Sequence, residues 1–309
     1  MIAGGTVQRI LRVLRAVFAP AAVLFLLFAV YGARGIVEET LRHARVLPFL
    51  AAVLAWAISH LLAPTLAWTV LEADGVRIGY ARALRIHVSR LPARYLPGGI
   101  WHTVSRVADY STLGATRVQL TRLVLLENSL PVALAAILGG GGMLLLGLAT
   151  PIAGAAVSLG VLLVLALPFV LRHRMLSAGT RFPVAAYLRA IVAMLGFWSV
   201  AALAFCAYWS AFPQPEQAPA LAAVASAYLL SWAAGFAMVF APQGLGVFEG
   251  SIAALLQGAT PFVDVVVLAA GFRAAVLGAD LLAYAVYLAL SRLRGSASPD
   301  SATDRSDKR

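Results

Sequence analysis

Charged residues, and lysine above all, are scarce in this sequence. Only 12% of the 309 residues are charged, and 23 of the 24 basic residues are arginine because Lys308 is the single lysine. Soluble domains carry about 25% charged residues, so this composition excludes an ordinary soluble domain. Cysteine is also nearly absent. Cys206 cannot form an internal disulfide, and we interpret it as a small apolar filler.

Sequence motifs for catalysis are absent as well. The chain has no Walker A loop, no HExxH, no CxxC and no G-x-S-x-G. Gly244-Leu245-Gly246 lacks the third glycine and the preceding strand of a dinucleotide-binding fingerprint. We therefore expect no enzyme, no cofactor and no metal site.

Long apolar runs dominate what is present. The sequence is 61% hydrophobic with a mean hydropathy of +0.88, and runs of about 20 residues, enough to cross a bilayer core as helix, recur throughout. This pattern predicts an all-α, polytopic transmembrane helical bundle with about 7–8 spans and one or two broken or re-entrant segments. The expected spans are 16–33, 47–71, 120–138, 152–171, 190–212, 220–240, 247–257 and 263–290. One transmembrane domain would cover residues 1–294, followed by a disordered cytoplasmic tail at 295–309.

We attribute the net charge of +11 to the orientation of the chain in the membrane and to attraction by anionic lipid headgroups, and not to a nucleic-acid partner. If both termini and the loops 72–122 and 172–189 face the cytoplasm, 20 basic residues lie inside and three lie outside. This count assumes that segment 247–257 crosses the membrane. The alternative is that the segment is re-entrant and returns to the side from which it started. We expect a multi-pass protein of a bacterial inner membrane with both termini cytoplasmic, bound to membrane lipids and not to nucleic acid.

Two helix breaks lie in apolar surroundings. The first is Pro97-Gly98-Gly99, and the second runs from Pro242 through Gly244 and Gly246 to Glu249. Broken backbone inside a membrane is tolerated only where protein or a water-filled cavity satisfies it. Paired broken segments in two halves indicate the central site of a transporter. We therefore consider an internal repeat with halves of about 16–145 and 146–293, against chance occurrence of proline and glycine.

Ionisable residues inside apolar spans are candidate site residues. Glu127, Glu249, Arg273 and Asp280 qualify, and Arg273 and Asp280 lie nearly on one helical face. They would pair with each other or across helices, either to hold the bundle together or to bind a substrate headgroup. His60 alone is more typical of a satisfied core histidine.

Arginines flank the first break. Arg94 and Arg106 could bind a lipid phosphate bidentately, or they could serve only orientation and contact with lipid headgroups. Trp101 and Tyr95 are typical of interfacial anchors. Residues 80–94 form an amphipathic pattern that suits a helix lying at the headgroups.

These motifs resemble a known family. The segment Arg94-Tyr95-Leu96-Pro97-Gly98-Gly99-Ile100-Trp101, the downstream Glu127 and the segment Pro242-Gln243-Gly244-Leu245-Gly246-Val247-Phe248-Glu249 are similar to the lysylphosphatidylglycerol synthase transmembrane-region family. The resemblance spans about residues 47–290 and departs at Gln243, where glycine is commoner. It implies a flippase-like protein that translocates a phospholipid or a polyprenyl-phosphate-linked headgroup between leaflets. No aminoacyl-transferase domain follows, so the synthase activity is not implied.

Two rival functions stay open at this point. The first is an accessory membrane subunit of a glycosyltransferase or lipid-modifying enzyme, which would need an enzyme partner. The second is a membrane enzyme that uses Glu127 or Glu249 as its base. A homodimer is also compatible with the sequence.

Overall fold

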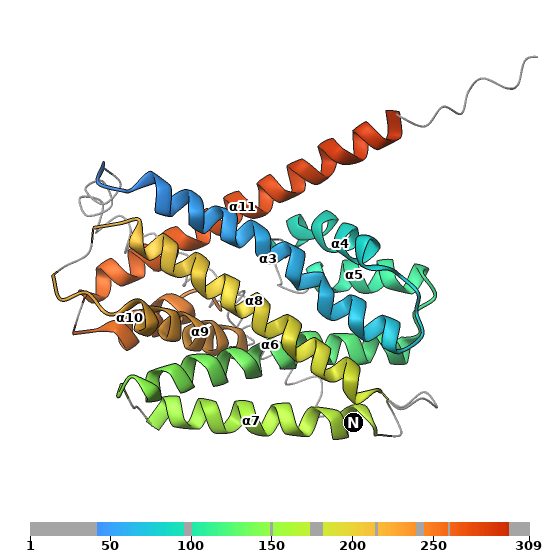
Figure 1. Ribbon diagram of the computed structural model, residues 1–309, viewed down its shortest axis with the longest axis horizontal. Coiled ribbons are helices and arrows are strands. Elements are labelled where there is room, and N and C mark those ends of the chain that lie inside the picture. The colour runs from blue at the N-terminus through green and yellow to red at the C-terminus, as the bar shows by residue number, and fades with distance from the viewer. Residues whose placement is uncertain are drawn as a thin grey trace, which may run out of the picture.

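The part of the chain that can be described is entirely helical (Figure 1). This computed structural model describes residues 42–95, 101–148, 151–173, 182–213, 216–238, 244–258 and 260–296. Its helices are α3 (Val46–Ala73), α4 (Tyr80–Ser89), the 3-10 helix η1 (Leu91–Tyr95), α5 (Trp101–Thr112), α6 (Arg117–Leu145), α7 (Pro151–Leu171), α8 (Val184–Ser210), α9 (Leu221–Ala237), α10 (Val247–Leu256) and α11 (Phe262–Ser296).

Five of these helices, α3, α6, α7, α8 and α11, are long and apolar enough to cross a membrane. Their outward faces are apolar: Leu47 is 80% exposed, Leu162 63% and Leu203 64%. Contiguous apolar surface of this extent on a soluble protein would be an aggregation liability, whereas lipid covers it without cost. The predicted helical membrane class is therefore confirmed for the described residues.

The predicted number of 7–8 spans is not confirmed. Helix α9 has 17 residues and α10 has ten. Ten residues of α-helix rise about 15 Å, half of a bilayer core of about 30 Å. The expected first span at 16–33 lies outside the described residues, as does the tail from residue 297, while residues 295 and 296 extend α11.

Close helix packing explains one departure from expectation. The span expected at 120–138 ends just before the glycine run 139–142, but α6 continues through this run to Leu145. A Cβ on Gly139 would lie 2.4 Å from the Leu230 backbone nitrogen, and one on Gly140 would lie 2.8 Å from the Ala153 carbonyl. The glycines therefore let α6 approach α9 and α7, and this gain in packing outweighs their low helix propensity.

Helix α4 packs against α3 and α11, η1 packs against α11, and α5 lies next to α4 and contacts η1 and α6 (Figure 1). The amphipathic segment 80–94 is divided between α4 and η1, and α4 buries Ala83 and His87 while Arg82 and Arg85 are exposed. The first break, with Pro97, Gly98 and Gly99, lies outside the described residues, and so does Pro242 of the second. What can be described is therefore the helices that flank each break.

Aromatic rings fill the core where α8, α9, α10 and α11 meet. Phe205 stacks on Tyr228 with centroids 4.7 Å apart, and Phe272 contacts both rings edge-on at 4.9 and 5.8 Å. Phe272 also meets Trp56 of α3 edge-on at 5.8 Å. This aromatic layer packs α11 against α3. Its Trp56 also donates a hydrogen bond to Asp280, so a buried polar cluster lies beside the layer.

Candidate functional site

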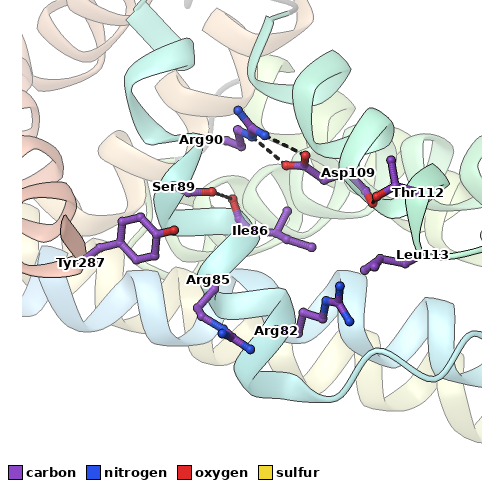
Figure 2. Close-up of a pocket in the computed structure, with 9 residues that line it drawn as sticks. All are labelled: Arg82, Arg85, Ile86, Ser89, Arg90, Asp109, Thr112, Leu113 and Tyr287. Atoms are coloured by element: carbon purple, nitrogen blue, oxygen red, sulfur yellow. Dashed lines mark hydrogen bonds and ion pairs between the residues drawn. The ribbon is translucent and has the colours of Figure 1, made fainter. Parts of the chain in front are cut away.

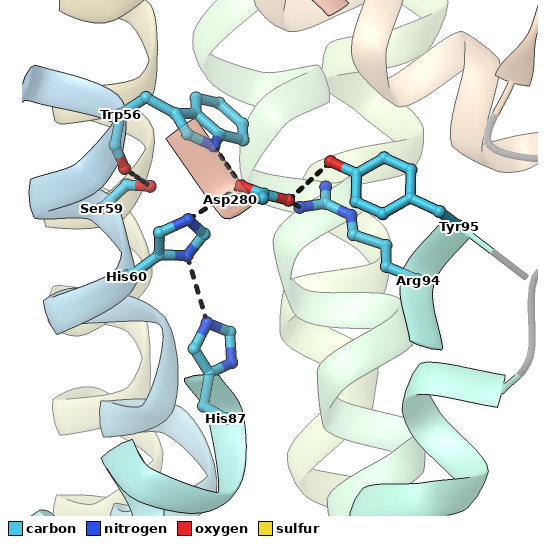
Figure 3. Close-up of polar contacts among 7 residues, drawn as sticks. All are labelled: Trp56, Ser59, His60, His87, Arg94, Tyr95 and Asp280. Carbon is cyan, nitrogen blue, oxygen red and sulfur yellow. Dashed lines mark hydrogen bonds and ion pairs between the residues drawn. The ribbon is translucent and has the colours of Figure 1, made fainter. Parts of the chain in front are cut away.

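A buried carboxylate, Asp280 of α11, forms the centre of the site (Figure 3). Its Oδ1 accepts hydrogen bonds from Trp56 Nε1 and His60 Nε2, both at 2.8 Å. Its Oδ2 accepts from the Tyr95 hydroxyl at 2.7 Å and from Arg94 at 3.3 Å. We call these five residues the Asp280 cluster.

The donors come from two separate elements. Trp56 and His60 are one turn apart on α3, and Arg94 and Tyr95 are adjacent in η1. The Asp280 side chain is 1% exposed, and burying a carboxylate is costly unless charge pairing and hydrogen bonds replace its water. The four donors supply that replacement and tie α3 and η1 to α11.

Two further histidines continue from this cluster. His60 Nδ1 lies 3.3 Å from Nε2 of His87 on α4, and the His87 ring meets His102 of α5 edge-on with centroids 5.7 Å apart. Burial, reinforced by the positive charge of Arg106, lowers the pKa of His87 well below its usual value. The same two causes lower the pKa of His102 to about 3. Both rings are therefore neutral at physiological pH.

The Arg106 guanidinium pairs with Glu127 of α6 and lies 5.8 Å above the Tyr110 ring. The two side chains of the ion pair are 8% and 15% exposed. This buried pair joins α5 to α6 next to the histidines, so the structure brings Arg106, Glu127 and the Asp280 cluster into one region.

The second break contributes a separate set of contacts. Glu249, which is completely buried, forms an ion pair with Arg273 and accepts a hydrogen bond from the Gly246 backbone at 2.8 Å. Arg273 also donates to the Gly244 carbonyl at 3.3 Å and lies 5.1 Å above the Phe248 ring. Glu249 thus caps the start of α10 and ties α10 to α11.

Gly244 is required in this arrangement for two reasons. Its φ is +65°, and a Cβ there would lie 2.7 Å from the Gly235 backbone of α9. The glycine therefore permits both the turn and the close approach of α10 to α9.

Arginines that lie beside the two breaks act electrostatically on the same side chain, that of Tyr95. Burial and the Asp280 charge raise the pKa of the Tyr95 hydroxyl, and the charges of both Arg94 and Arg273 oppose that rise. Arg273 is therefore electrostatically close to the Asp280 cluster although it pairs with Glu249. Arg273 and Asp280 were expected to pair either with each other or with residues of other helices. In the structure Arg273 pairs with Glu249 of α10, and Asp280 binds residues of α3 and η1.

The exposure of the arginines separates them into two groups. The side chains of Arg94 and Arg273 are 33% and 26% exposed, whereas that of Arg106 is 8% and that of Arg122 is 0%. Arg122 pairs with Asp74, which is itself 2% exposed, at the end of α3. Arg94 and Arg273 can thus meet an incoming ligand, while Arg106 and Arg122 are enclosed by the protein.

A basic pocket of about 350 Å³ lies on the outer side of α4 and α5 (Figure 2). Arg82 and Arg85 reach toward it from α4, and Tyr287 borders it from α11. At its rim Arg90 donates two hydrogen bonds to Asp109, at 2.6 and 2.7 Å. The Asp109 charge is neutralised in this way, so Arg82 and Arg85 give the pocket a positive potential.

Sequence reasoning missed several members of the site. His87 and His102 were not considered, Tyr95 was interpreted only as an anchor, and His60 as a core histidine. One signal was available: the chain has five histidines, and three of them fall between residues 60 and 102. Trp101, expected at an interface, is 47% exposed at the start of α5.

Comparison with models of known protein families finds no match, and comparison with curated proteins finds no similar sequence. In the part of the chain that the structure describes, no group of three or more His, Cys, Asp or Glu residues could hold a metal ion.

Proposed function

We propose that this protein moves a phosphate-bearing lipid headgroup between the leaflets of a bacterial inner membrane, as its resemblance to the flippase-like family implies. The substrate is a phospholipid or a polyprenyl-phosphate-linked lipid. One observation carries the proposal: Arg94 is partly exposed, and it is the most distant of the four donors to Asp280.

An arginine held in this way can exchange partners at low cost. When Arg94 leaves, Asp280 keeps the hydrogen bonds from Trp56, His60 and Tyr95, so the buried carboxylate is not stranded. A phosphate offers the guanidinium the same bidentate geometry as a carboxylate. Arg94 can therefore transfer to the lipid phosphate while the bundle stays intact.

Arg273 supplies a second contact. It is partly exposed beside the second break, and Glu249 keeps it oriented from the side of α10. The basic pocket formed by Arg82 and Arg85 gives the headgroup its first contact at the membrane surface. In this proposal the glutamates hold arginines in place, and neither serves as a catalytic base.

Reconstituted vesicles test the proposal. A fluorescent phospholipid in the inner leaflet becomes accessible to a membrane-impermeant quencher only after it moves outward. Arg94→Ala is expected to slow this movement about 10- to 100-fold, because a hydrogen bond to a charged group contributes about 1.5–3 kcal/mol. Arg117→Ala is the matched control, since Arg117 is exposed at the start of α6.

Two results would contradict the proposal. If folded wild-type protein moves no lipid and instead co-purifies with a glycosyltransferase or lipid-modifying enzyme, the accessory-subunit alternative is correct. If Arg94→Ala and Arg117→Ala move lipid as fast as the wild type does, Arg94 does not bind the headgroup.

A further inference from the structure

A line of three histidines leads to Asp280 from α5, and its members lie on three different helices. His102 lies on α5, His87 on α4 and His60 on α3. The His60 Nε2 atom is 2.8 Å from Asp280, and His60 Nδ1 is 3.3 Å from His87 Nε2 (Figure 3). Such an arrangement exceeds what is needed to satisfy one carboxylate, because Trp56 and Tyr95 already donate to it.

The direction of the hydrogen bonds follows from chemistry. An ionised carboxylate only accepts, so His60 Nε2 carries the proton that it donates to Asp280. When the His60 ring carries only this proton, its Nδ1 is an acceptor, and His87 donates from Nε2 to His60 Nδ1. His87 Nδ1 is consequently an acceptor, oriented away from Asp280.

The far end of this line is poised to receive a proton. Among the described residues, neither His87 Nδ1 nor His102 Nε2 has a hydrogen-bond partner, although both atoms are buried. Buried polar atoms without a protein partner are usually satisfied by water. Because the His102 and His87 rings are in edge-on contact, a proton has only a short distance to travel from one ring to the other.

We propose that His102, His87 and His60 form a proton-transfer path that ends at the Asp280 carboxylate. A proton arriving through His102 adds to His87 Nδ1, and His87 releases its Nε2 proton to His60 Nδ1. His60 then releases its own Nε2 proton to Asp280 Oδ1. One proton has moved and the carboxylate has become neutral. Both rings return to the starting tautomer when the proton leaves Asp280 by the same steps in reverse.

The charged and titratable groups around the path come from every element packed against it. These groups are Arg94 and Tyr95 of η1, Arg106 and Tyr110 of α5, Glu127 of α6 and Arg273 of α11. Burial and the arginine charges lower the pKa of His87 and His102, so a proton does not come to rest on either ring. Neutral rings with one donor and one acceptor are the state that proton relay requires.

The path acquires a role through the proposed function, on which this step rests. Protonating Asp280 removes the charge that attracts Arg94, so the lipid phosphate meets less competition for the guanidinium. Proton arrival would then favour headgroup binding, and proton departure would favour its release. No nucleotide motif is present in the sequence, and this coupling would supply a source of energy.

The experiment follows Asp280 directly, without measuring lipid movement. Infrared difference spectra after a rapid pH drop record the carbonyl stretch of a newly protonated carboxyl, which Asp280→Asn should remove. His87→Phe should slow the appearance of this band about 100-fold, the effect of losing a proton-transfer group, while its final amplitude is retained. His102→Gln, at a half-buried position, provides a second and milder block.

His43→Gln is the matched control because His43 is exposed and distant from the path in sequence. Unchanged band kinetics in folded His87→Phe and His102→Gln would overturn the relay, and so would the absence of a band that depends on Asp280. Lipid movement is measured on the same samples. A relay without lipid movement would refute the proposed function alone, whereas lipid movement without the relay would refute the inference alone.

Discussion

At the scale of single residues, burial decides what each ionisable group can do. Arg122 and Asp74 form an ion pair in which both side chains are buried. Arg94 also pairs with a buried aspartate, Asp280, but its own side chain is one-third exposed. Asp280 differs from both because it has three hydrogen-bond donors besides its arginine. Only this last arrangement allows the ion pair to open without stranding a buried charge.

The two neutral histidines predict a loss of stability in mild acid. Their folded pKa values lie below the unfolded value of about 6.5, so below pH 6.5 the unfolded chain binds more protons. Stability is therefore complete above pH 6.5. Between pH 6.5 and 5 it should fall by about 1.4 kcal/mol per pH unit for His102, and His87 adds a loss in the same direction. Thermal unfolding of detergent-solubilised protein measures this slope.

His102→Phe is the comparison for that measurement. Removal of one titrating group should flatten the slope by roughly half, since His87 remains. A melting temperature that stays constant from pH 7 to pH 5 in the wild type would contradict the prediction.

At the scale of helices, sequence patterns predicted where the long apolar elements lie but not how their polar residues meet. Span 152–171 corresponds to α7 within one residue, because an uninterrupted apolar run leaves little freedom. The glycine run at 139–142 misled the prediction of where α6 ends, since its purpose is close packing against α9. Likewise, the pairing of Arg273 with Glu249 instead of Asp280 depends on tertiary approach, which no local pattern encodes.

Prolines within the helices leave the carbonyl four residues earlier without its helical hydrogen-bond donor. Pro168 cannot donate a hydrogen bond to the Val164 carbonyl four residues earlier, and the Tyr187 hydroxyl of α8 donates to that carbonyl instead, at 2.7 Å. Pro64 of α3 likewise leaves the His60 carbonyl without its helical donor. The helix is thus locally loosened at the histidine that contacts Asp280.

The pair Asp74–Arg122 predicts a large effect at this scale. Gln119 also donates to the Asp74 carbonyl at 2.7 Å, so the end of α3 is bound to the first turns of α6 by two residues. Arg122→Ala should destabilise the protein by about 3–5 kcal/mol, because it leaves a buried carboxylate unpaired. Replacing both partners, with Asp74→Leu and Arg122→Met, should cost much less. Thermal or denaturant unfolding measures both, and equal losses in the two variants would contradict this account.

At the scale of the whole molecule, the distribution of arginine predicts orientation. The exposed arginines Arg77, Arg82, Arg85 and Arg117 lie in the stretch from the end of α3 through α4 to the start of α6. The segment 213–219 contains no basic residue. By the positive-inside rule the first region should face the cytoplasm and the second the outside.

Cysteine labelling tests this orientation in intact cells. With Cys206→Ser as background, an impermeant maleimide should label Gln217→Cys from outside and should leave Arg85→Cys unlabelled until the membrane is permeabilised. Both positions are exposed, so accessibility within the protein does not limit the reaction. Labelling in the reverse order would invert the topology.

The contacts of Asp280 also have a consequence for how the protein is made. Trp56 and His60 leave the ribosome more than 200 residues before Asp280, and Arg94 leaves it 186 residues before. During synthesis these donors therefore enter the membrane without their acceptor, and the cluster closes only when α11 arrives as the last described helix. A chain that stalls before residue 280 would present Arg94 and His60 without the Asp280 carboxylate that they bind. Quality-control proteases of the membrane could recognise that state as an unfinished product.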